Sequence, residues 1–354
     1  MSGRMSVIGC MSGTSLDGLD IALVDFELKN NIIGYNIVHA KTYSYNEIWF
    51  DRLKNAMHLS GFDLSLLDVE YGIWIGEQIK EFTDEFFIDL KSVSAIASHG
   101  HTVFHRPELK VSTQIGSGNA IHSIIKRPVV FDFRSLDVTL GGQGAPLVPI
   151  GDRLLFSEYD YCLNLGGFAN LSYEFNNRRM AFDICPLNIV LNALSQKHGF
   201  TFDRNGELGR ASTINIPLLD QLNTLQFYKK EAPKSLGKEW VDLNINPLIS
   251  DIEENLSTIT TFYEHCAFQI GKILKNTSSK TLVTGGGAYN SFLMERIKYY
   301  AESEIVIAEN IIVEFKEALI FALLAYLKLN NRINTLASVT GACCDSIGGI
   351  SVGL

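Results

Sequence analysis

Apolar and polar positions along the chain follow two different periods, which predicts strands interleaved with helices. Apolar runs of strand length lie at residues 5–10, 21–26, 93–97, 128–133 and 304–308. Apolar positions recur at helical spacing over residues 185–198, 252–275 and 313–330. Strands that alternate with helices in this way are typical of the α/β class, which we predict here.

Three glycine clusters punctuate this pattern, and two of them repeat the same arrangement. The segments MSGTSLDGLD (11–20) and LNLGGFAN (163–170) each join two strand-like runs, so each opens one half of the molecule. The third cluster, Gly285–Gly287, follows a strand and precedes a helical pattern. We predict a first domain of residues 1–136, completed by residues 338–354, and a second domain of residues 137–337. The loop 137–151, which combines Gly, Pro and polar residues, marks the expected boundary.

Composition narrows the class of protein. The 354 residues, of which 46% are hydrophobic, suffice for two domains of about 150 residues each. A net charge of −9 without a basic cluster argues against a nucleic-acid partner. The longest apolar run, ALIFALLAYL (318–327), is too short for a membrane span, and the N-terminal apolar stretch is too short for a secretion signal. We therefore expect a cytoplasmic protein with reduced cysteines.

The glycine clusters are candidate phosphate-binding loops. The chain has neither the Walker P-loop spacing nor a dinucleotide fingerprint opening a helix. A hairpin loop of Gly, Ser and Thr can still surround an anion with backbone N–H groups, although ordinary turn chemistry explains one such loop equally well. Two loops in equivalent positions plus a glycine turn favour a nucleotide. The candidate nucleotide-binding residues are Gly13, Thr14, Ser15, Leu16, Asp17, Gly18, Leu19, Asp20, Gly166, Gly167, Asn170, Gly285, Gly286 and Gly287.

Two aspartates are candidates for chemistry. Asp20 either caps the turn or contacts Mg²⁺ indirectly through water, as phosphoryl transfer from ATP requires. Asp183 ends a predicted strand, and Pro186 takes the expected first position of a helix. Asp183 is therefore either a helix N-cap or a general base that points into the site.

A histidine-rich segment and two charged residues complete the candidates. The spacing of His99, His101 and His105 permits a metal site, but no strong fourth ligand lies nearby, so a substrate-lining loop is favoured. Arg134, at an expected strand end, either pairs with a neighbouring carboxylate or clamps a ligand carboxylate. Glu317 opens the apolar helix and by itself indicates only compensation of the helix dipole.

The motifs together resemble the anhydro-N-acetylmuramic acid kinase family over nearly the whole chain. They are GCMSGTSLDGLD, SHGHTVFH, DFRSLDVTLGGQGAPLVP, LNLGGFANLSY, TGGGAYNSFLMERI, KEALIFALLAY and SVTGA, in family order. The resemblance implies two related actin-like ATPase domains of the ribonuclease H type, with a nucleotide cleft between them. It also implies a homodimer that uses ATP and Mg²⁺. Such kinases open the 1,6-anhydro ring of anhydro-N-acetylmuramic acid and phosphorylate O6 during peptidoglycan recycling.

The resemblance also implies roles for individual residues. The loop from Gly13 to Asp20 would hold the ATP phosphates, and no direct metal ligand is expected. Asp183 would activate the attacking water. His99, Arg134 and Glu317 would contact the amino sugar.

Two segments depart from the family pattern. FDICPLN replaces the usual F-D-T-G-P-G-N, which places Cys185 and Leu187 where glycines are usual, and SHGHT places His101 where glutamine is usual. Cys and Leu resist backbone angles that glycine permits. A kinase of another anhydro-sugar and a non-catalytic nucleotide-binding protein of the same fold therefore remain as alternatives.

Overall fold

The computed structural model describes residues 4–13, 16–250 and 255–354, which divide into two compact units. The first unit comprises residues 1–155 and 315–354, and the second comprises residues 156–314. The loop 137–151 thus lies inside the first unit, and residues 315–337 belong there too, unlike in the sequence-based division. The apolar run 318–327 accounts for this difference, because it packs into the first unit. Helix α13 (Asn310–Leu329) crosses the boundary and has non-helical angles at Phe315, where the units meet in sequence.

The first unit is built on a six-stranded sheet with the order β13-β7-β4-β1-β2-β3. The strands are β1 (Met5–Ser12), β2 (Leu19–Lys29), β3 (Ile32–Tyr43), β4 (Val93–Ser98), β7 (Val129–Phe131) and β13 (Ile350–Val352). A separate ribbon pairs β5 (His101–Arg106) with β6 (Val111–Ile115). The helices are α1 (Glu47–Lys54), α2 (Gly61–Glu85), α3 (Gly118–Ile125), α4 (Ser135–Thr139), α5 (Pro149–Leu155) and α14 (Ala337–Thr340).

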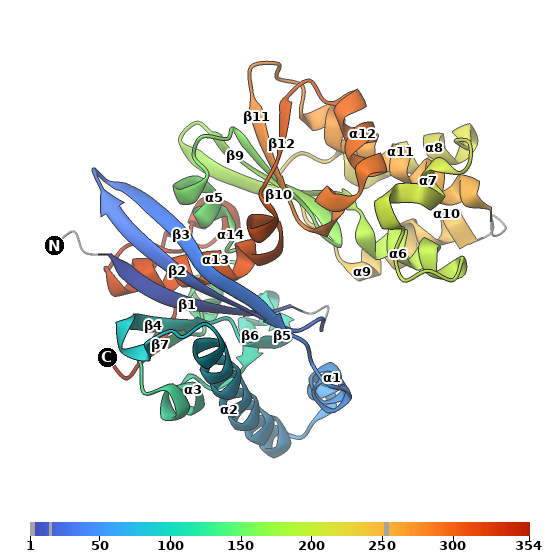
Figure 1. Ribbon diagram of the computed structural model, residues 1–354. Coiled ribbons are helices and arrows are strands. Elements are labelled where there is room, and N and C mark those ends of the chain that lie inside the picture. The colour runs from blue at the N-terminus through green and yellow to red at the C-terminus, as the bar shows by residue number, and fades with distance from the viewer. Residues whose placement is uncertain (1–3, 14–15, 251–254) are drawn as a thin grey trace. The chain divides into compact units, whose positions relative to one another are not determined.

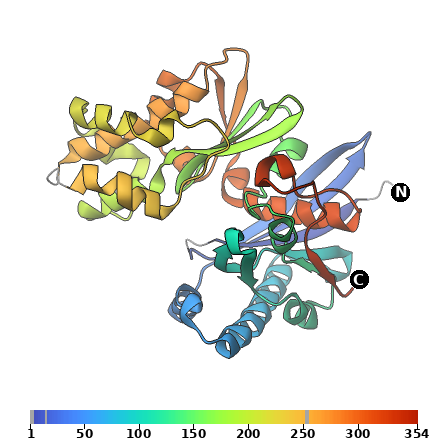
Figure 2. The ribbon, with the colours of Figure 1, turned by 180° about the vertical axis from the view of Figure 1, so that it is seen from behind.

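Helices cover both faces of this sheet. Helices α2 and α3 lie on one face, where buried residues such as Ile75 and Ile121 pack on strand residues such as Ile8. The C-terminal part of α13 lies along the other face in both views (Figures 1 and 2). There the Phe26 and Tyr326 rings are 5.0 Å apart, and Gly9 leaves room for the backbone of Ala318. Burial on both faces explains the apolar strands of this sheet.

The second unit contains a five-stranded sheet with the order β10-β9-β8-β11-β12. The strands are β8 (Tyr161–Leu165), β9 (Phe168–Phe175), β10 (Arg178–Pro186), β11 (Lys280–Thr284) and β12 (Glu304–Ile307). The helices are α6 (Asn188–Lys197), α7 (Glu207–Arg210), α8 (Ile216–Asn223), α9 (Lys238–Asn244), α10 (Asn246–Ser250), α11 (Leu256–Ile273) and α12 (Ser291–Tyr300). Buried α11 packs against α6, α7, α8, α12 and β10, and it forms the centre of the helical layer.

The two sheets share one topology. In the first sheet, the antiparallel strands β1, β2 and β3 extend to one side, and the parallel strands β4 and β7 extend to the other. In the second sheet, β8, β9 and β10 correspond to the antiparallel group, and β11 and β12 correspond to the parallel pair. The predicted α/β class with two related units is confirmed.

Several local predictions need correction. Pro186 is the last residue of β10, and α6 starts at Asn188, so Pro186 is not the first residue of the helix. Helix α13 begins at Asn310, which places Glu317 two turns into the helix instead of at its start. Strand β7 ends at Phe131, and Arg134 lies at the N-cap position of α4. Pro186 is tolerated at the end of β10 because β10 is an edge strand, where a missing N–H breaks no ladder hydrogen bond.

Candidate active site

The parallel strands of the first sheet end at one edge, and several predicted site residues gather there. Strand β1 leads into the glycine loop, β4 leads into His99, and β7 leads toward Arg134. The His99 backbone N–H donates to Cys10 O at 3.0 Å, which ties the first two connections together. This edge therefore collects the side chains that follow β1, β4 and β7.

His99 and Arg134 form one hydrogen-bonded unit. Arg134 Nε and Nη2 lie 3.1 and 2.9 Å from His99 Nε2, and Nη1 donates to Gly144 O at 2.7 Å. His99 Nδ1 lies 2.8 Å from Gly100 O, so the proton is on Nδ1 and Nε2 accepts. Burial, and then the charge of Arg134, holds the His99 pKa well below its usual value. His99 is thus a neutral support that orients Arg134.

Arg134 was expected either to pair with a neighbouring carboxylate or to clamp the carboxylate of a ligand. The contacts described for the guanidinium are those to His99 and Gly144. Asp132 accepts from the Ser135 N–H, and Asp137 accepts from the Gly144 N–H and the Thr340 hydroxyl. Neither aspartate is among these contacts; the carboxylate that acts on Arg134 electrostatically is Glu317, and the guanidinium N–H groups not used by His99 and Gly144 remain for a ligand anion.

Glu317 and Asp20 lie within electrostatic range of one another in the same unit. Surrounding protein atoms raise the pKa of Glu317, Arg134 lowers it, and Asp20 raises it. Glu317 nevertheless retains an exposed surface on α13. Asp20, on β2, accepts a hydrogen bond of 2.6 Å from the Thr42 hydroxyl of β3. A carboxyl group that is crowded by protein yet accessible suits a ligand contact.

The glycine loop 13–18 connects β1 to β2, and Thr14 and Ser15 lie outside the described residues. The Leu16 N–H donates to Gly13 O at 3.3 Å, and Leu16 has a positive φ of 60°. A Cβ at Gly18 would lie 2.6 Å from Tyr43 O, so only glycine fits there. The described part of the loop therefore packs on β3 at Gly18.

A hydrogen-bonded group that the sequence analysis missed supports the start of this loop. The Ser12 hydroxyl accepts from Tyr45 OH at 2.8 Å and lies 3.2 Å from His101 Nδ1. Tyr45 OH also lies 2.6 Å from Tyr71 OH. Burial lowers the pKa of His101 to about 4, so this histidine is neutral near pH 7. No group of metal-ligating side chains that could hold an ion occurs within the described ranges, His99, His101 and His105 included.

In the second unit, the two remaining glycine clusters meet at the carboxyl ends of β8 and β11. A Cβ at Gly285, whose φ is +82°, would lie 2.6 Å from Asn164 Oδ1, and one at Gly287 would lie 2.8 Å from Leu165 Cβ. A Cβ at Gly286 or Gly167 would meet nothing within 4 Å. Gly285 and Gly287 are thus needed for packing, whereas Gly167 and Gly286 border open space that a ligand can approach.

A row of polar side chains crosses this sheet beside the glycine turns. In register, Thr284 of β11 pairs with Asn164 of β8, Asn164 with Asn170 of β9, and Asn170 with Asp183 of β10. Paired residues project to the same face of a sheet, so the four side chains form one row. The Thr284 hydroxyl is buried and has no hydrogen-bond partner among the described residues. Sequence reasoning identified Asn170 and Asp183 but missed Asn164 and Thr284.

Asp183 occupies an irregular position in β10. The register of β9 and β10 shifts between Asp183 and Cys185, which is a β-bulge, and bulges re-aim side chains near active sites. The carboxylate accepts a 2.8 Å hydrogen bond from the backbone N–H of Leu236, so it does not cap helix α6. Burial raises the pKa of Asp183, and the Leu236 N–H opposes this shift. An ionisable carboxyl group with a raised pKa is a candidate general base.

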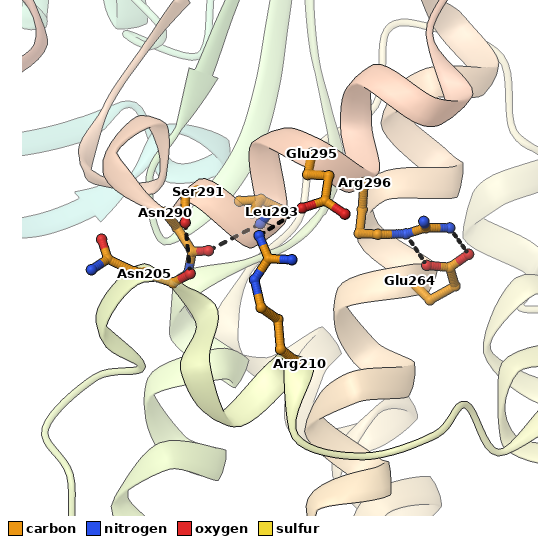
Figure 3. A network of polar contacts seen from close by, with 8 residues as sticks. All are labelled: Asn205, Arg210, Glu264, Asn290, Ser291, Leu293, Glu295 and Arg296. Atoms are coloured by element: carbon orange, nitrogen blue, oxygen red, sulfur yellow. Dashed lines mark hydrogen bonds and ion pairs between the residues drawn. The ribbon is translucent and has the colours of Figure 1, made fainter.

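The helix that follows the glycine turn is held by several polar contacts (Figure 3). Asn290 Oδ1 caps α12 by accepting from the Leu293 N–H at 3.0 Å, and Ser291 Oγ donates to Asn205 O at 3.1 Å. Figure 3 also shows two ion pairs of this helix, Arg210 with Glu295 at 2.6 Å and Arg296 with Glu264 at 2.7 Å. These contacts fix α12, and therefore the turn at Gly286, relative to α7 and α11.

Two sheets of one topology, each with glycine turns at the carboxyl edge of its parallel strands, form the frame of the candidate site, and the sequence comparisons identify the class of protein as a sugar kinase. Residues 5–352 match the family model of anhydro-N-acetylmuramic acid kinase, and the chain belongs to this family.

Curated relatives and solved structures give the following similarities. Anhydro-N-acetylmuramic acid kinases of Francisella tularensis subsp. novicida and Sulfurovum sp. are 31% and 33% identical to the chain, and the alignments cover 97% and 98% of both partners. Among solved structures, component A of the Acidaminococcus fermentans (R)-2-hydroxyglutaryl-CoA dehydratase has a TM-score of 0.46 at 14% identity, covering 92% of this chain and 99% of that one. A ROK family glucokinase from Streptomyces griseus has a TM-score of 0.39 at 12% identity, with 90% and 98% covered.

Proposed function

We propose that this chain converts 1,6-anhydro-N-acetylmuramic acid to N-acetylmuramic acid 6-phosphate with ATP, in the recycling of peptidoglycan. The observation that carries the proposal is the position of Asp183, at a bulge, with a raised pKa, in the polar row beside two glycine turns. Family membership supplies the substrate class. The same use of ATP favours a cytoplasmic enzyme, and the family resemblance favours a homodimer.

The reaction needs a base because water must attack the anomeric carbon. Asp183 takes a proton from this water as its oxygen bonds to C1, and the bond between C1 and O6 breaks. The released O6 then bonds to the γ-phosphorus of ATP, the bond between this group and the β-phosphate breaks, and ADP leaves. The proton held by Asp183 finally passes to solvent, which restores the carboxylate.

The residues of the chain fit a nucleotide with Mg²⁺ in two ways. Gly167 and Gly286 border open space, so backbone can approach phosphate there without side chains in the way. Asp20 offers a carboxylate near the glycine loop that suits contact with magnesium-bound water, since Mg²⁺ usually keeps several waters. We assign the loop from Gly13 to Asp20, with Gly166, Gly167, Asn170 and Gly285–Gly287, to the nucleotide.

The first-unit edge suits the sugar. Arg134, which His99 orients, is assigned to the carboxylate of the lactyl group, because a guanidinium pairs with a carboxylate through two hydrogen bonds. Glu317 is assigned to a sugar hydroxyl, since its carboxyl group is accessible.

One experiment tests the reaction and the base together. The protein is incubated with ATP and the anhydro-sugar in heavy-oxygen water, and the product is examined by mass spectrometry. We expect one phosphoryl group and one heavy oxygen, with the heavy oxygen on C1. Asp183→Asn should lower turnover by about 10²-fold or more, whereas Asp242→Asn, at an exposed position of α9 in the same unit, should not. Turnover of Asp183→Asn within a few-fold of the original protein would exclude Asp183 as the base.

A further inference from the structure

A short segment far along the chain contacts Asp183 at two points. The Asp183 backbone N–H donates to Lys234 O at 3.0 Å, and the Leu236 backbone N–H donates to Asp183 Oδ2 at 2.8 Å. We call residues 234–236 the strap. Because β10 is the edge strand of its sheet, the strap pairs with the edge at the residue where the β-bulge begins.

The strap is anchored on the other face of β10. Lys234 Nζ donates to Phe227 O at 3.3 Å and lies 4.7 Å from the centre of the Phe227 ring. It also lies 5.8 Å from the centre of the Phe182 ring. Phe182 precedes Asp183, so the two side chains project to opposite faces of the strand. The ammonium group of Lys234 therefore lies on one face of β10 and the Leu236 N–H on the other, and the strap crosses the edge of the strand between them.

The consequence for Asp183 is both geometric and electrostatic. The described residues provide one donor to this carboxylate, the Leu236 N–H on Oδ2, which leaves Oδ1 available to a water molecule. A backbone donor stabilises the ionised form of a carboxyl group and thereby counteracts its burial. The contact therefore fixes the orientation of the group and keeps it ionised.

We propose that the strap is the positioning element of the general base, with the Leu236 N–H as the group that orients Asp183 and Lys234 as its anchor. This inference rests on the proposed function, since it concerns the same base. The strap contacts Asp183 through its backbone, and none of its side chains is assigned to the reacting atoms. The strap acts through Asp183.

Other ionisable groups near β10 do not replace this donor. The elements packed against β10 include β9, α11 and the strap, and Tyr228, in the segment 226–229, acts electrostatically on Cys185 of β10. Their ionisable side chains, with those of β10 itself, are Tyr173, Glu174, Arg178, Arg179, Cys185, Lys234, Tyr263, Glu264, His265, Cys266 and Lys272. The causes that act on the pKa of Asp183 are burial and then the Leu236 N–H, and none of these groups is among them.

The test removes the donor and follows the pH profile of kcat/KM. Leu236→Pro lacks the N–H, whereas Leu236→Ala keeps it and only shortens the side chain. We expect Leu236→Pro to move the acidic limb of the profile upward by about one to two pH units, because a hydrogen bond to a charged group has this strength. Its activity should recover toward higher pH, which a merely misfolded protein would not do. Leu236→Ala separates loss of packing from loss of the donor.

The anchor provides a second pair of variants. Lys234→Met removes the ammonium group, and Lys234→Arg keeps the charge and the contacts with the rings. We expect Lys234→Met to move the acidic limb of the kcat/KM profile upward as well, and Lys234→Arg to leave this limb at its original pH. A folded Leu236→Pro variant with the original acidic limb would overturn the inference. If that variant does not fold, an unchanged limb in Lys234→Met would overturn it.

The inference and the proposed function fail in different ways. If the original protein forms no sugar phosphate, the proposed function fails, and the inference fails with it. If Asp183→Asn is as active as the original protein, Asp183 is not the base, and the inference fails while the reaction stands. If Asp183→Asn is inactive and the strap variants keep the original pH profile, only the role of the strap is lost.

Discussion

Gly286 offers the sharpest test of where the nucleotide binds. A Cβ at this position meets no atom within 4 Å, and the backbone does not adopt the left-handed angles that favour glycine. A valine should therefore be accepted by the fold. If the glycine turn approaches the nucleotide, however, the same side chain occupies the space of the ligand.

The two effects differ in size. Without a clash or backbone strain, Gly286→Val should change the free energy of unfolding by less than about 1 kcal/mol. Excluding the nucleotide from its best position should weaken ATP binding by at least about tenfold, which corresponds to about 1.4 kcal/mol. The neighbouring Gly285 and Gly287 are unsuitable for this test, because a Cβ at either position would lie within 3 Å of the β8 segment.

Calorimetry with a non-hydrolysable ATP analogue and a thermal melt on the same preparation check both values. Gly61→Val is a matched control, since a Cβ at Gly61 also meets nothing within 4 Å and the residue opens α2 in the other unit. A Gly286→Val protein that melts normally and binds the analogue within about twofold of the original would refute the assignment of this turn.

The other predictions concern the sugar, the core and the helical layer. Arg134→Lys keeps the charge but loses the planar fork, so KM for the muramic substrate should rise about tenfold or more while KM for ATP changes little; equal rises would contradict a carboxylate clamp. Gly9→Ala should destabilise the first unit by about 1–3 kcal/mol in urea titration, because the added carbon overlaps the α13 backbone, whereas Gly34→Ala, whose nearest atom lies 3.7 Å away, serves as its control. In the second unit, Glu264→Gln breaks a two-point ion pair with Arg296 and should cost about 1–3 kcal/mol of unfolding free energy; an unchanged urea midpoint would show that this pair adds nothing.

Local sequence patterns predicted the parts of the site that local chemistry determines. The glycine clusters were recognisable because few residue types can form such turns, and Gly166–Gly167 and Gly285–Gly287 do follow strands β8 and β11. The repeated hairpin predicted the duplicated sheet for the same reason. In the structure, the pairing of β9 with β10 places Asn170 beside Asp183.

Contacts between distant segments could not be predicted in this way. The strap lies about fifty residues after Asp183, and its contacts are made by backbone groups, which carry no sequence signature. Thr284 and Asn164 meet only because β8 and β11 are parallel neighbours. The division into compact units differs from the sequence-based one because the apolar run 318–327 fits any buried helix, and no local pattern indicates which sheet this helix covers.

The departure from the family pattern at FDICPLN has a structural explanation that bears on activity. Ile184, Cys185 and Leu187 are at most 2% exposed, so the side chains that replace smaller residues point into the core. Neither Cys185 nor Leu187 adopts a positive φ, so the segment does not use the left-handed angles that favour glycine.

The polar groups of this segment keep their contacts. Asp183 stays half-buried and bonded to Leu236, and Asn188 Nδ2 donates to Leu165 O at 3.2 Å beside the glycine turn. The Leu187 N–H donates to Gly167 O at 2.9 Å. The larger side chains therefore repack the interior beneath the site while the carboxylate and the turn remain in place, which favours retained catalysis over a binding protein without activity.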